Sequence, residues 1–243
     1  MIARARAKGG KVSEEPSRLA FESSTSAELQ VVQEPGRTIY RSVGKRVFDV
    51  TLVVAAAPVW GFVYGVVALL ILLFDGRPIY HRAARVGWRG RDIEVLKFRT
   101  MRPDAGQVLA SLLSADPELE REFKLTYKLQ DDPRVTALGR WLRRLSLDEL
   151  PQLVNVLKGD MSLVGPRPVV RPELEEYYGE AGDRVLAVRP GLTGLWQVSG
   201  RSLLSYDDRV ALDLEYVEKG SLLMDLRVLL NTIPSVWRGH GAF

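Results

Sequence analysis

Two adjacent carboxylates, Asp148 and Glu149, lie in a stretch that is rich in positive charge. The segment reads LSLDELPQLVNVLKGDMSLVGPRP over residues 145–168, with two arginines directly before it and a third, Arg167, near its end. Consecutive residues of a helix diverge by about 100°, so this pair cannot enclose one bond from opposite sides as glycosidase carboxylates do. The two carboxylates can share a metal ion or a phosphate approached from one side, which favours phosphoryl transfer.

A structural role for the same residues fits the pattern equally well. A helix is predicted from near Asp148 to Lys158, because apolar residues recur with the spacing of one helical face and Pro151 fits only the first turn. Asp148 could then be an N-cap, and Ser146 with Glu149 matches a capping box. Capping does not exclude chemistry, since a helix N-terminus stabilises a carboxylate as its anion and an ionised aspartate is a competent nucleophile toward phosphorus.

Other charged residues suit a phosphate site. Arg167 lies between two prolines, and its planar guanidinium can bind a phosphate through two hydrogen bonds. Lys97 and Arg99 alternate on a predicted strand, which gives two cations on one face. The plain alternative is that an arginine in a turn, or on a helix as at Arg143 and Arg144, is solvated.

Composition narrows the choice of partner and metal. The 243 residues carry a formal charge of +4 with a pI near 9.4, which suits anionic partners without choosing among them. The absence of cysteine excludes disulfides and thiolate metal sites, and the two histidines are far apart. Any metal is therefore expected to be a hard, oxygen-bound ion such as Mg²⁺. Neither a P-loop nor a dinucleotide glycine fingerprint is present, so nucleotide binding would use another scheme.

The elements that must position these residues begin with a membrane segment. Residues 50–74 contain no charge, and as a helix they would extend about 37 Å, enough for a hydrocarbon core of about 30 Å. Pro58 should break this helix, and basic residues flank it on both sides. Two basic flanks favour a re-entrant hairpin with both ends in the cytoplasm over a single kinked span.

The chain is predicted to have a mixed α/β fold in three parts. Residues 1–36 are polar and predict a flexible tail, residues 37–78 the membrane helix, and residues 79–243 a small catalytic domain. Short strands are expected on either side of a turn at residues 87–90, and a helix from Asp116. An apolar helix over residues 222–237 packs on the core or lies at the membrane interface, and the core is favoured.

Six motifs together resemble the bacterial sugar transferases, monotopic phosphoglycosyl transferases that load a sugar phosphate onto a polyprenol phosphate. They are KRVFDV, KFRTM, LSLDELPQL, NVLKGDMSLVGPRP, RPGLTGLWQVSGR and DLRVLL, and they span about residues 43–237 in the family's order. The versions QDDPRVT and GLWQVSGR look most like the enzymes that begin exopolysaccharide repeat units of the succinoglycan type and transfer galactose phosphate. One departure is Ala57 before the helix-breaking proline, where the family often has serine, whose hydroxyl could satisfy a freed backbone group.

The resemblance implies a two-step mechanism. Asp148 matches the nucleophile, which would attack the β-phosphorus of a UDP-sugar, release UMP and carry the sugar phosphate until undecaprenyl phosphate takes it. Glu149 matches its partner, a candidate for positioning Mg²⁺ or for handling a proton at the acceptor, and both carboxylates are predicted metal ligands. Five residues match family positions linked to activity or phosphate binding and are predicted to bind substrate: Lys97, Arg143, Arg167, Arg201 and Asp225. Arg99, on the same strand face as Lys97, and Gln197, in the polar cluster that ends the Gly-rich segment RPGLTGLWQVSGR, are predicted to bind substrate as well.

The resemblance also implies a place and a set of partners. The protein would lie in the bacterial inner (cytoplasmic) membrane with its catalytic domain and amphipathic interfacial helices facing the cytoplasm. Membrane lipid is an expected partner, nucleic acid is not, and a homodimer is compatible with the sequence. The sequence does not distinguish galactose from glucose. The alternative to an enzyme is a membrane-anchored scaffold whose arginines bind anionic lipid or nucleic acid, but such a protein gains nothing from two carboxylates at a helix start.

Overall fold

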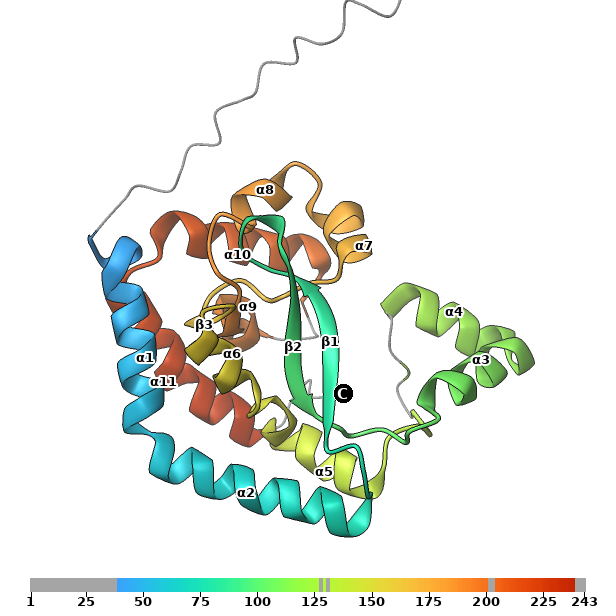
Figure 1. Ribbon diagram of the computed structural model, residues 1–243. Helices are drawn as coiled ribbons and strands as arrows, with labels where there is room; N and C mark the ends of the chain where they lie inside the picture. The colour runs from blue at the N-terminus through green and yellow to red at the C-terminus, as the bar shows by residue number, and fades with distance from the viewer. Residues whose placement is uncertain (1–38, 127–128, 130–131, 201–203, 239–243) are drawn as a thin grey trace, which may run out of the picture. The chain divides into compact units, whose positions relative to one another are not determined.

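The computed structural model describes residues 39–126, 129, 132–200 and 204–238, so the predicted tail at residues 1–36 lies outside the described residues (Figure 1). The described elements, with η for π- and 3₁₀-helices, are in chain order η1 (Tyr40–Gly44), α1 (Lys45–Ala55), α2 (Ala57–Phe74), β1 (Tyr80–Val86), η2 (Trp88–Gly90), β2 (Asp92–Phe98), α3 (Ala105–Ala115), α4 (Pro117–Thr126), α5 (Ala137–Arg144), η3 (Leu147–Glu149), α6 (Gln152–Lys158), β3 (Ser162–Val164), α7 (Arg171–Glu173), η4 (Leu174–Tyr178), α8 (Ala181–Val185), β4 (Gly191–Thr193), α9 (Leu195–Ser199), α10 (Tyr206–Lys219) and α11 (Leu222–Arg238).

Two short pairs of strands confirm the mixed α/β prediction. Strands β1 and β2 form the predicted hairpin, in which Tyr80 pairs with Phe98 and Val86 with Asp92 around the turn at η2. Strands β3 and β4 form a separate parallel pair, with Ser162 opposite Gly191. The hairpin carries Lys97 toward the carboxylate pair, and the parallel pair leads directly into the GPRP motif.

Asn155 fastens helix α6 to the side of strand β2. It is 1% exposed, its amide nitrogen donates to the Glu94 carbonyl at 2.8 Å, and its amide oxygen accepts from the Leu96 N–H at 3.0 Å. The side chain therefore bonds the strand as a neighbouring strand would, through one donor and one acceptor. This contact fixes the distance between β2 and the segment that carries Asp148 and Glu149.

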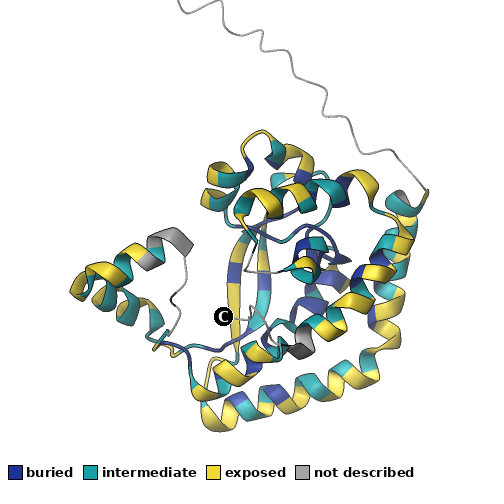
Figure 2. Cartoon of the chain, turned by 180° about the vertical axis from the view of Figure 1, so that it is seen from behind, coloured by how far each residue is buried: buried dark blue, intermediate teal, exposed yellow. Residues whose placement is uncertain are grey.

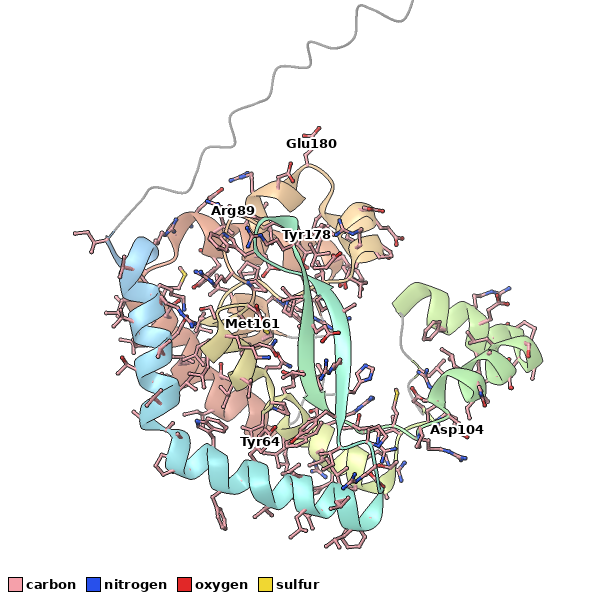
Figure 3. All side chains as sticks on the ribbon, viewed as in Figure 1. Tyr64, Arg89, Asp104, Met161, Tyr178 and Glu180 are labelled. Atoms are coloured by element: carbon pink, nitrogen blue, oxygen red, sulfur yellow. The ribbon has the colours of Figure 1, made fainter. Side chains whose placement is uncertain are left out.

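The main hydrophobic core joins α1, part of the predicted membrane segment, to the rest of the described chain. Val53 of α1 is buried in one cluster with Val95 of β2, Val156 of α6 and Val228 of α11. Met161, labelled in Figure 3, belongs to the same cluster and is fully buried. The predicted boundary between residues 78 and 79 therefore does not separate two cores.

The helix break lies at Ala56, two residues before the predicted break at Pro58. Helix α1 ends at Ala55 and α2 begins at Ala57, which places Pro58 in the first turn of α2, where its missing N–H breaks no helical hydrogen bond. The indole N–H of Trp60 donates to the Val53 carbonyl at 2.8 Å. The tryptophan thus satisfies a carbonyl at the break, the role that a hydroxyl at position 57 could have had.

Helices α1 and α2 leave this break in different directions (Figures 1 and 2). Helix α2 is the one described helix long and apolar enough to cross a membrane, and only 11% of it is buried. The buried part, Val67 and Ile71, packs on Phe98 of β2 and Leu142 of α5. The remaining faces are exposed and apolar, with Phe62 75% exposed, which argues against a core helix.

A buried polar cluster holds α1 against α10 and α11. Asp225 at the start of α11 is completely buried and accepts a hydrogen bond from Tyr216 at 2.9 Å and a short one from Tyr40. Lys45 of α1 lies 3.0 Å from Asp225 and 2.9 Å from Asp49, which also accepts from a serine of β3. The carboxylates are thus paired and hydrogen-bonded inside the protein, as buried charges must be.

Helix α11 has one face in the core and another on the surface. Val228 is buried, whereas a row of large apolar residues is exposed, namely Leu222, Leu223, Leu226, Leu230 and Ile233. One face of α11 therefore packs on the core, as was favoured, and another face is apolar and exposed, as a position at a membrane interface would require. Trp237, which would be the anchor of this helix at a membrane interface, has its side chain outside the described residues.

We expect Asn155→Ala to lower the free energy of unfolding by about 2–4 kcal/mol, because it leaves the Glu94 carbonyl and the Leu96 N–H buried without partners. Val154→Ala on the same helix, at a half-buried position, should cost about 1 kcal/mol. Denaturant unfolding of the detergent-solubilised variants measures both. Equal losses would show that Asn155 has no special role.

Candidate active site

A cleft of about 920 Å³ lies between the β1–β2 hairpin and the segments that follow it. It is lined by seven of the nine predicted catalytic or binding residues, Lys97, Arg99, Arg143, Asp148, Glu149, Arg167 and Gln197. Among all the described residues that line it, eight are arginine or lysine (Arg85, Lys97, Arg99, Arg102, Arg134, Arg143, Arg167, Arg209) and three are acidic (Asp132, Asp148, Glu149). The cleft is therefore a site for a polyanion that also presents a carboxylate pair.

The carboxylate pair lies on a 3₁₀ turn and not at the start of the following helix. Ser146 has a left-handed backbone (φ 53°), η3 covers Leu147–Glu149, and α6 begins only at Gln152. Neither η3 nor α6 has a side-chain cap, so the predicted capping box does not form. The structural alternative for Asp148 thus loses its support, and the strained backbone of Ser146 is of the kind found at functional sites.

Burial and local charge together set the protonation of Asp148. The residue is 9% exposed, and burial followed by repulsion from Glu149 raises its pKa to about 6, against an ordinary 3.8. Lys97 and Arg143 act in the opposite direction and lower this pKa. The carboxyl is consequently ionised at neutral pH but weakly hydrated, a favourable state for a nucleophile.

Two cations flank the pair from different elements. Lys97 of β2 forms an ion pair with Glu149, with Nζ 2.8 Å from Oε1. Arg143 in the last turn of α5 donates to the Thr100 hydroxyl at 2.9 Å, and burial lowers its pKa while the Asp148 carboxylate raises it. Arg143 is therefore a cleft residue, in contrast to the solvated helix face that was its plain alternative. Its neighbour Arg144 is exposed.

The GPRP loop is held by close backbone packing. The Gly165 N–H donates to the Thr193 carbonyl at 2.9 Å and the Gly191 N–H to the Pro166 carbonyl at 2.7 Å. A Cβ atom on Gly191 would lie 2.1 Å from the Gly165 nitrogen, so these two loops can meet only as glycines. This contact places Arg167 in the cleft, with its guanidinium 5.4 Å from the centre of the Trp196 ring.

Asp213 of α10 lies next to Arg167 of the GPRP loop. It is 1% exposed and accepts a hydrogen bond from Tyr178, labelled in Figure 3, at 2.9 Å. Burial raises the pKa of Asp213 to about 7, while the hydroxyl of Tyr178 and the guanidinium and backbone N–H of Arg167 lower it. Asp213 is a positioning residue, and no motif in the sequence marks it as one.

Three further residues near the cleft were not predicted, because a single charged residue outside a motif does not indicate a binding site. Arg209 of α10 lies over Trp196, on which Arg167 also stacks, at 5.3 Å from the ring centre. Arg85 of β1 faces Arg167, and burial followed by this like charge lowers the Arg85 pKa. The pKa of His81 is lowered by burial and by three surrounding cations. Cations held this close to one another form a strong anion site.

Three predicted substrate-binding residues have other surroundings. Arg99 lines the cleft, but its Nη2 donates to the Asp75 and Gly76 carbonyls, at 2.6 and 2.9 Å, and so caps the end of α2. Asp225 does not line the cleft, because its carboxylate is buried in the cluster that holds α1, so its predicted substrate contact has no support here. Arg201 lies outside the described residues.

The carboxylate pair fits Mg²⁺ only together with a substrate. Within residues 39–126, 129, 132–200 and 204–238, no three His, Cys, Asp or Glu side chains converge as metal ligands. Mg²⁺ commonly takes one or two carboxylates and completes its octahedron with water and substrate phosphates. Asp148 and Glu149 match that donor set, and a cation would relieve the repulsion that raises the Asp148 pKa.

We expect Asp148→Asn to make the fold more stable at pH 8. The raised pKa means that the folded state binds this proton more tightly than the unfolded chain, so ionisation destabilises the fold by on the order of 3 kcal/mol above pH 6. The difference in free energy of unfolding between variant and parent should shrink as the pH falls from 6 toward 4. It should disappear below pH 3.8, the ordinary pKa of an aspartate, because the carboxyl is then protonated in both the folded and the unfolded state. Thermal unfolding midpoints across this range test it. An asparagine variant less stable than the parent at pH 8 would contradict the charge balance described here.

Comparison with known proteins agrees with this site. Residues 40–239 match the bacterial sugar transferase family. The exopolysaccharide production protein ExoY of Sinorhizobium fredii is 46% identical over 227 residues, covering 92% of this chain and 99% of that protein. ExoY of Rhizobium meliloti is 43% identical over 223 residues, or 90% and 97% of the two chains. The undecaprenyl-phosphate galactose phosphotransferase of Salmonella typhimurium is 44% identical over 203 residues, 82% of this chain and 41% of that longer protein. The chain therefore belongs to the bacterial sugar transferase family, as its motifs predicted, and is an enzyme of the phosphoglycosyl transferase type.

Proposed function

We propose that the protein transfers a sugar 1-phosphate from a UDP-sugar to undecaprenyl phosphate, releases UMP, and so performs the first membrane step of exopolysaccharide synthesis. The buried, ionisable Asp148 inside a cleft of cations is the observation that carries this proposal. The relatives named above are exopolysaccharide production proteins and an undecaprenyl-phosphate phosphotransferase. Family membership also favours an enzyme over the scaffold that the sequence left open.

In the first step, a carboxylate oxygen of Asp148 attacks the phosphorus that bears the sugar. The bond from this phosphorus to the oxygen bridging the two phosphates breaks, and UMP leaves with the electron pair. The sugar phosphate stays on Asp148 as an acyl phosphate. Arg143 beside Asp148 and the Arg167–Trp196–Arg209 stack provide positive charge for the diphosphate, and electrostatic stabilisation is the main source of catalysis in phosphoryl transfer.

In the second step, a phosphate oxygen of the acceptor attacks the same phosphorus. The bond between this phosphorus and the Asp148 oxygen breaks, the Asp148 carboxylate leaves with the electron pair, and the product is a sugar-bearing polyprenyl diphosphate. Glu149 lies beside Asp148 and pairs with Lys97, so it can keep this cation close to the incoming phosphate. Mg²⁺, held by Asp148 and Glu149 together with the diphosphate, would supply additional neutralisation of charge.

Galactose is the sugar that we propose first. The name of the Salmonella relative specifies galactose, and the UDP-galactose–lipid carrier transferase of Erwinia amylovora is 48% identical over 181 residues. The undecaprenyl-phosphate glucose phosphotransferase of Komagataeibacter xylinus is less similar, with 38% identity over 234 residues. Glucose is therefore the second donor to test.

The contacts at both ends of the membrane segment support the re-entrant arrangement. Before α1, Arg41 bonds the Glu218 and Gly220 carbonyls, and after α2, Arg99 bonds the Asp75 carbonyl. Both ends of the segment are thus attached to one folded unit, which favours a position on one side of the membrane. We propose that this is the cytoplasmic side of the inner membrane, because both flanks are basic.

The covalent step predicts a labelled protein. Incubation with Mg²⁺ and UDP-galactose carrying ³²P at the β-phosphate, without acceptor, should leave label on the denatured protein and release UMP. Asp148→Asn should reduce both by about 10³-fold or more, because the nucleophile is gone. Asp183→Asn, an exposed carboxylate on α8, is the matched control and should label normally. Label that persists in Asp148→Asn would sink the mechanism, and a panel of UDP-sugars separates a wrong sugar from wrong chemistry.

The pH dependence of UMP release should follow Asp148. The rate should fall at acidic pH, because the protonated carboxyl is no nucleophile, and Mg²⁺ at the pair should place this fall below the metal-free pKa of about 6. Glu149 raises this pKa and Lys97 lowers it, so the acid limb should move to lower pH in Glu149→Gln and to higher pH in Lys97→Met. Shifts in the same direction for the two variants would show that another group controls the limb.

A further inference from the structure

A second, apolar groove of about 830 Å³ lies beside the cleft. Three helices line it: α1 with Leu52, α5 with Trp141 and Arg144, and α11 with Leu229, Thr232 and Ile233; Leu145, directly after α5, completes the lining. Five of these seven side chains are apolar. The volume lies in the range of about 300–1,000 Å³ that is typical of sites for organic ligands.

The groove and the cleft share a wall. Leu229 and Thr232 of α11 line both cavities. The Thr232 hydroxyl lies 2.9 Å from the hydroxyl of Thr193, which also lines the cleft, and donates to the Val228 carbonyl at 2.7 Å. A molecule in the groove is therefore separated from the active-site cleft by only one layer of side chains.

Arg144 gives this apolar groove a single positive charge. The side chain is exposed, and within the described part of the chain it makes no ion pair or hydrogen bond. Its sequence neighbour Arg143 reaches into the cleft. A cation at the edge of an apolar groove, next to a phosphate-handling site, fits a ligand with an anionic head and a hydrocarbon chain.

The same groove borders the apolar surface of the protein. Ile233 is 64% exposed and Trp141 48%, and Leu230, which does not line the groove, is 68% exposed on the same helix. The yellow segments in Figure 2 follow the outer faces of the helices. A chain that enters from a bilayer could thus pass along α11 without crossing water.

We propose that this groove holds the isoprenoid chain of the acceptor, that Arg144 binds the acceptor's phosphate at its edge, and that Leu229 and Thr232 mark the passage into the cleft. This inference rests on the proposed function, and it specifies where the lipid substrate binds. The second step requires the acceptor phosphate to reach the phosphorus on Asp148, and the shared wall brings lipid chain and reacting phosphate to adjacent cavities.

Photo-crosslinking tests this assignment on the full chain in phosphatidylcholine nanodiscs. The probe is a polyprenyl phosphate with a diazirine on an isoprene unit near the phosphate, with a diazirine-bearing phosphatidylcholine in a parallel sample. We expect the polyprenyl probe to label peptides that contain Trp141–Leu145 and Leu229–Ile233, and excess undecaprenyl phosphate to remove this label. The phosphatidylcholine probe should instead label the exposed faces of α2 and α11 without competition.

Two matched pairs of variants refine the test. Ile233→Trp fills the groove and should reduce its labelling about tenfold, whereas Leu230→Trp adds the same bulk outside it and should not. Arg144→Gln should raise the acceptor KM about tenfold or more through loss of a charge-assisted hydrogen bond, whereas Arg140→Gln on the same helix should not. UMP release without acceptor should stay at the parental rate in all four variants.

Several outcomes would overturn the inference. They are labelling that resists undecaprenyl phosphate, labelling confined to α2, or equal labelling in Ile233→Trp and Leu230→Trp. The first half-reaction is measured separately, so its absence in the parent protein would overturn the proposed function and not the location of the lipid. Conversely, normal UMP release together with photo-labelling outside the groove would support the proposed function and overturn the assignment of the groove to the lipid.

Discussion

The structure depends on keeping one carboxylate charged where water is scarce. Burial and the adjacent Glu149 favour the neutral form of Asp148, and Lys97 and Arg143 favour the anion. The balance leaves the pKa near 6, so the group is ionised at neutral pH yet poorly solvated. Each of these contributions comes from a different element, and the relative positions of β2, α5 and η3 are therefore the quantity that the fold must hold constant.

Specific hydrogen bonds and close approaches of the backbone hold these elements in position. Asn155 bonds α6 to the edge of β2 as if it were another strand. Gly165 and Gly191 bring two loops together at a distance no side chain would allow, and this aims Arg167 at the cleft. The polar cluster around Asp225 holds α1 against α10 and α11. The residues of the cleft, helix α1 and the core are consequently held together by buried contacts.

Local patterns in the sequence predicted local structure well. Alternation of apolar residues predicted the β1–β2 hairpin, and the motifs brought seven of nine predicted site residues into one cleft. What failed or was missed depends on distant contacts. Nothing in the sequence around Arg85, Arg209 or Asp213 indicates a binding site. Arg209 and Asp213 come next to the GPRP loop only through the packing of α10. Asp225 was predicted to bind substrate, but Tyr40 and Lys45, far away in the sequence, and the nearer Tyr216 surround its carboxylate. The helix break lies at Ala56 and not at Pro58, because proline is tolerated in the first turn of a helix. The presence of a proline in the sequence does not tell whether the break lies at the proline or just before it.

The central claim is that the sugar phosphate is carried by Asp148 itself. Borohydride reduces an acyl phosphate of aspartate to homoserine, so tritiated borohydride can record the residue that carried it. The protein would be incubated with Mg²⁺ and UDP-galactose in the absence of acceptor, reduced, digested and sequenced by mass spectrometry. Tritiated homoserine at position 148, dependent on the UDP-sugar, is the result that this account predicts. Tritiated 2-amino-5-hydroxypentanoic acid at position 149, which is the reduction product of a glutamyl phosphate, or no reduced residue at all in a preparation that releases UMP, would contradict it.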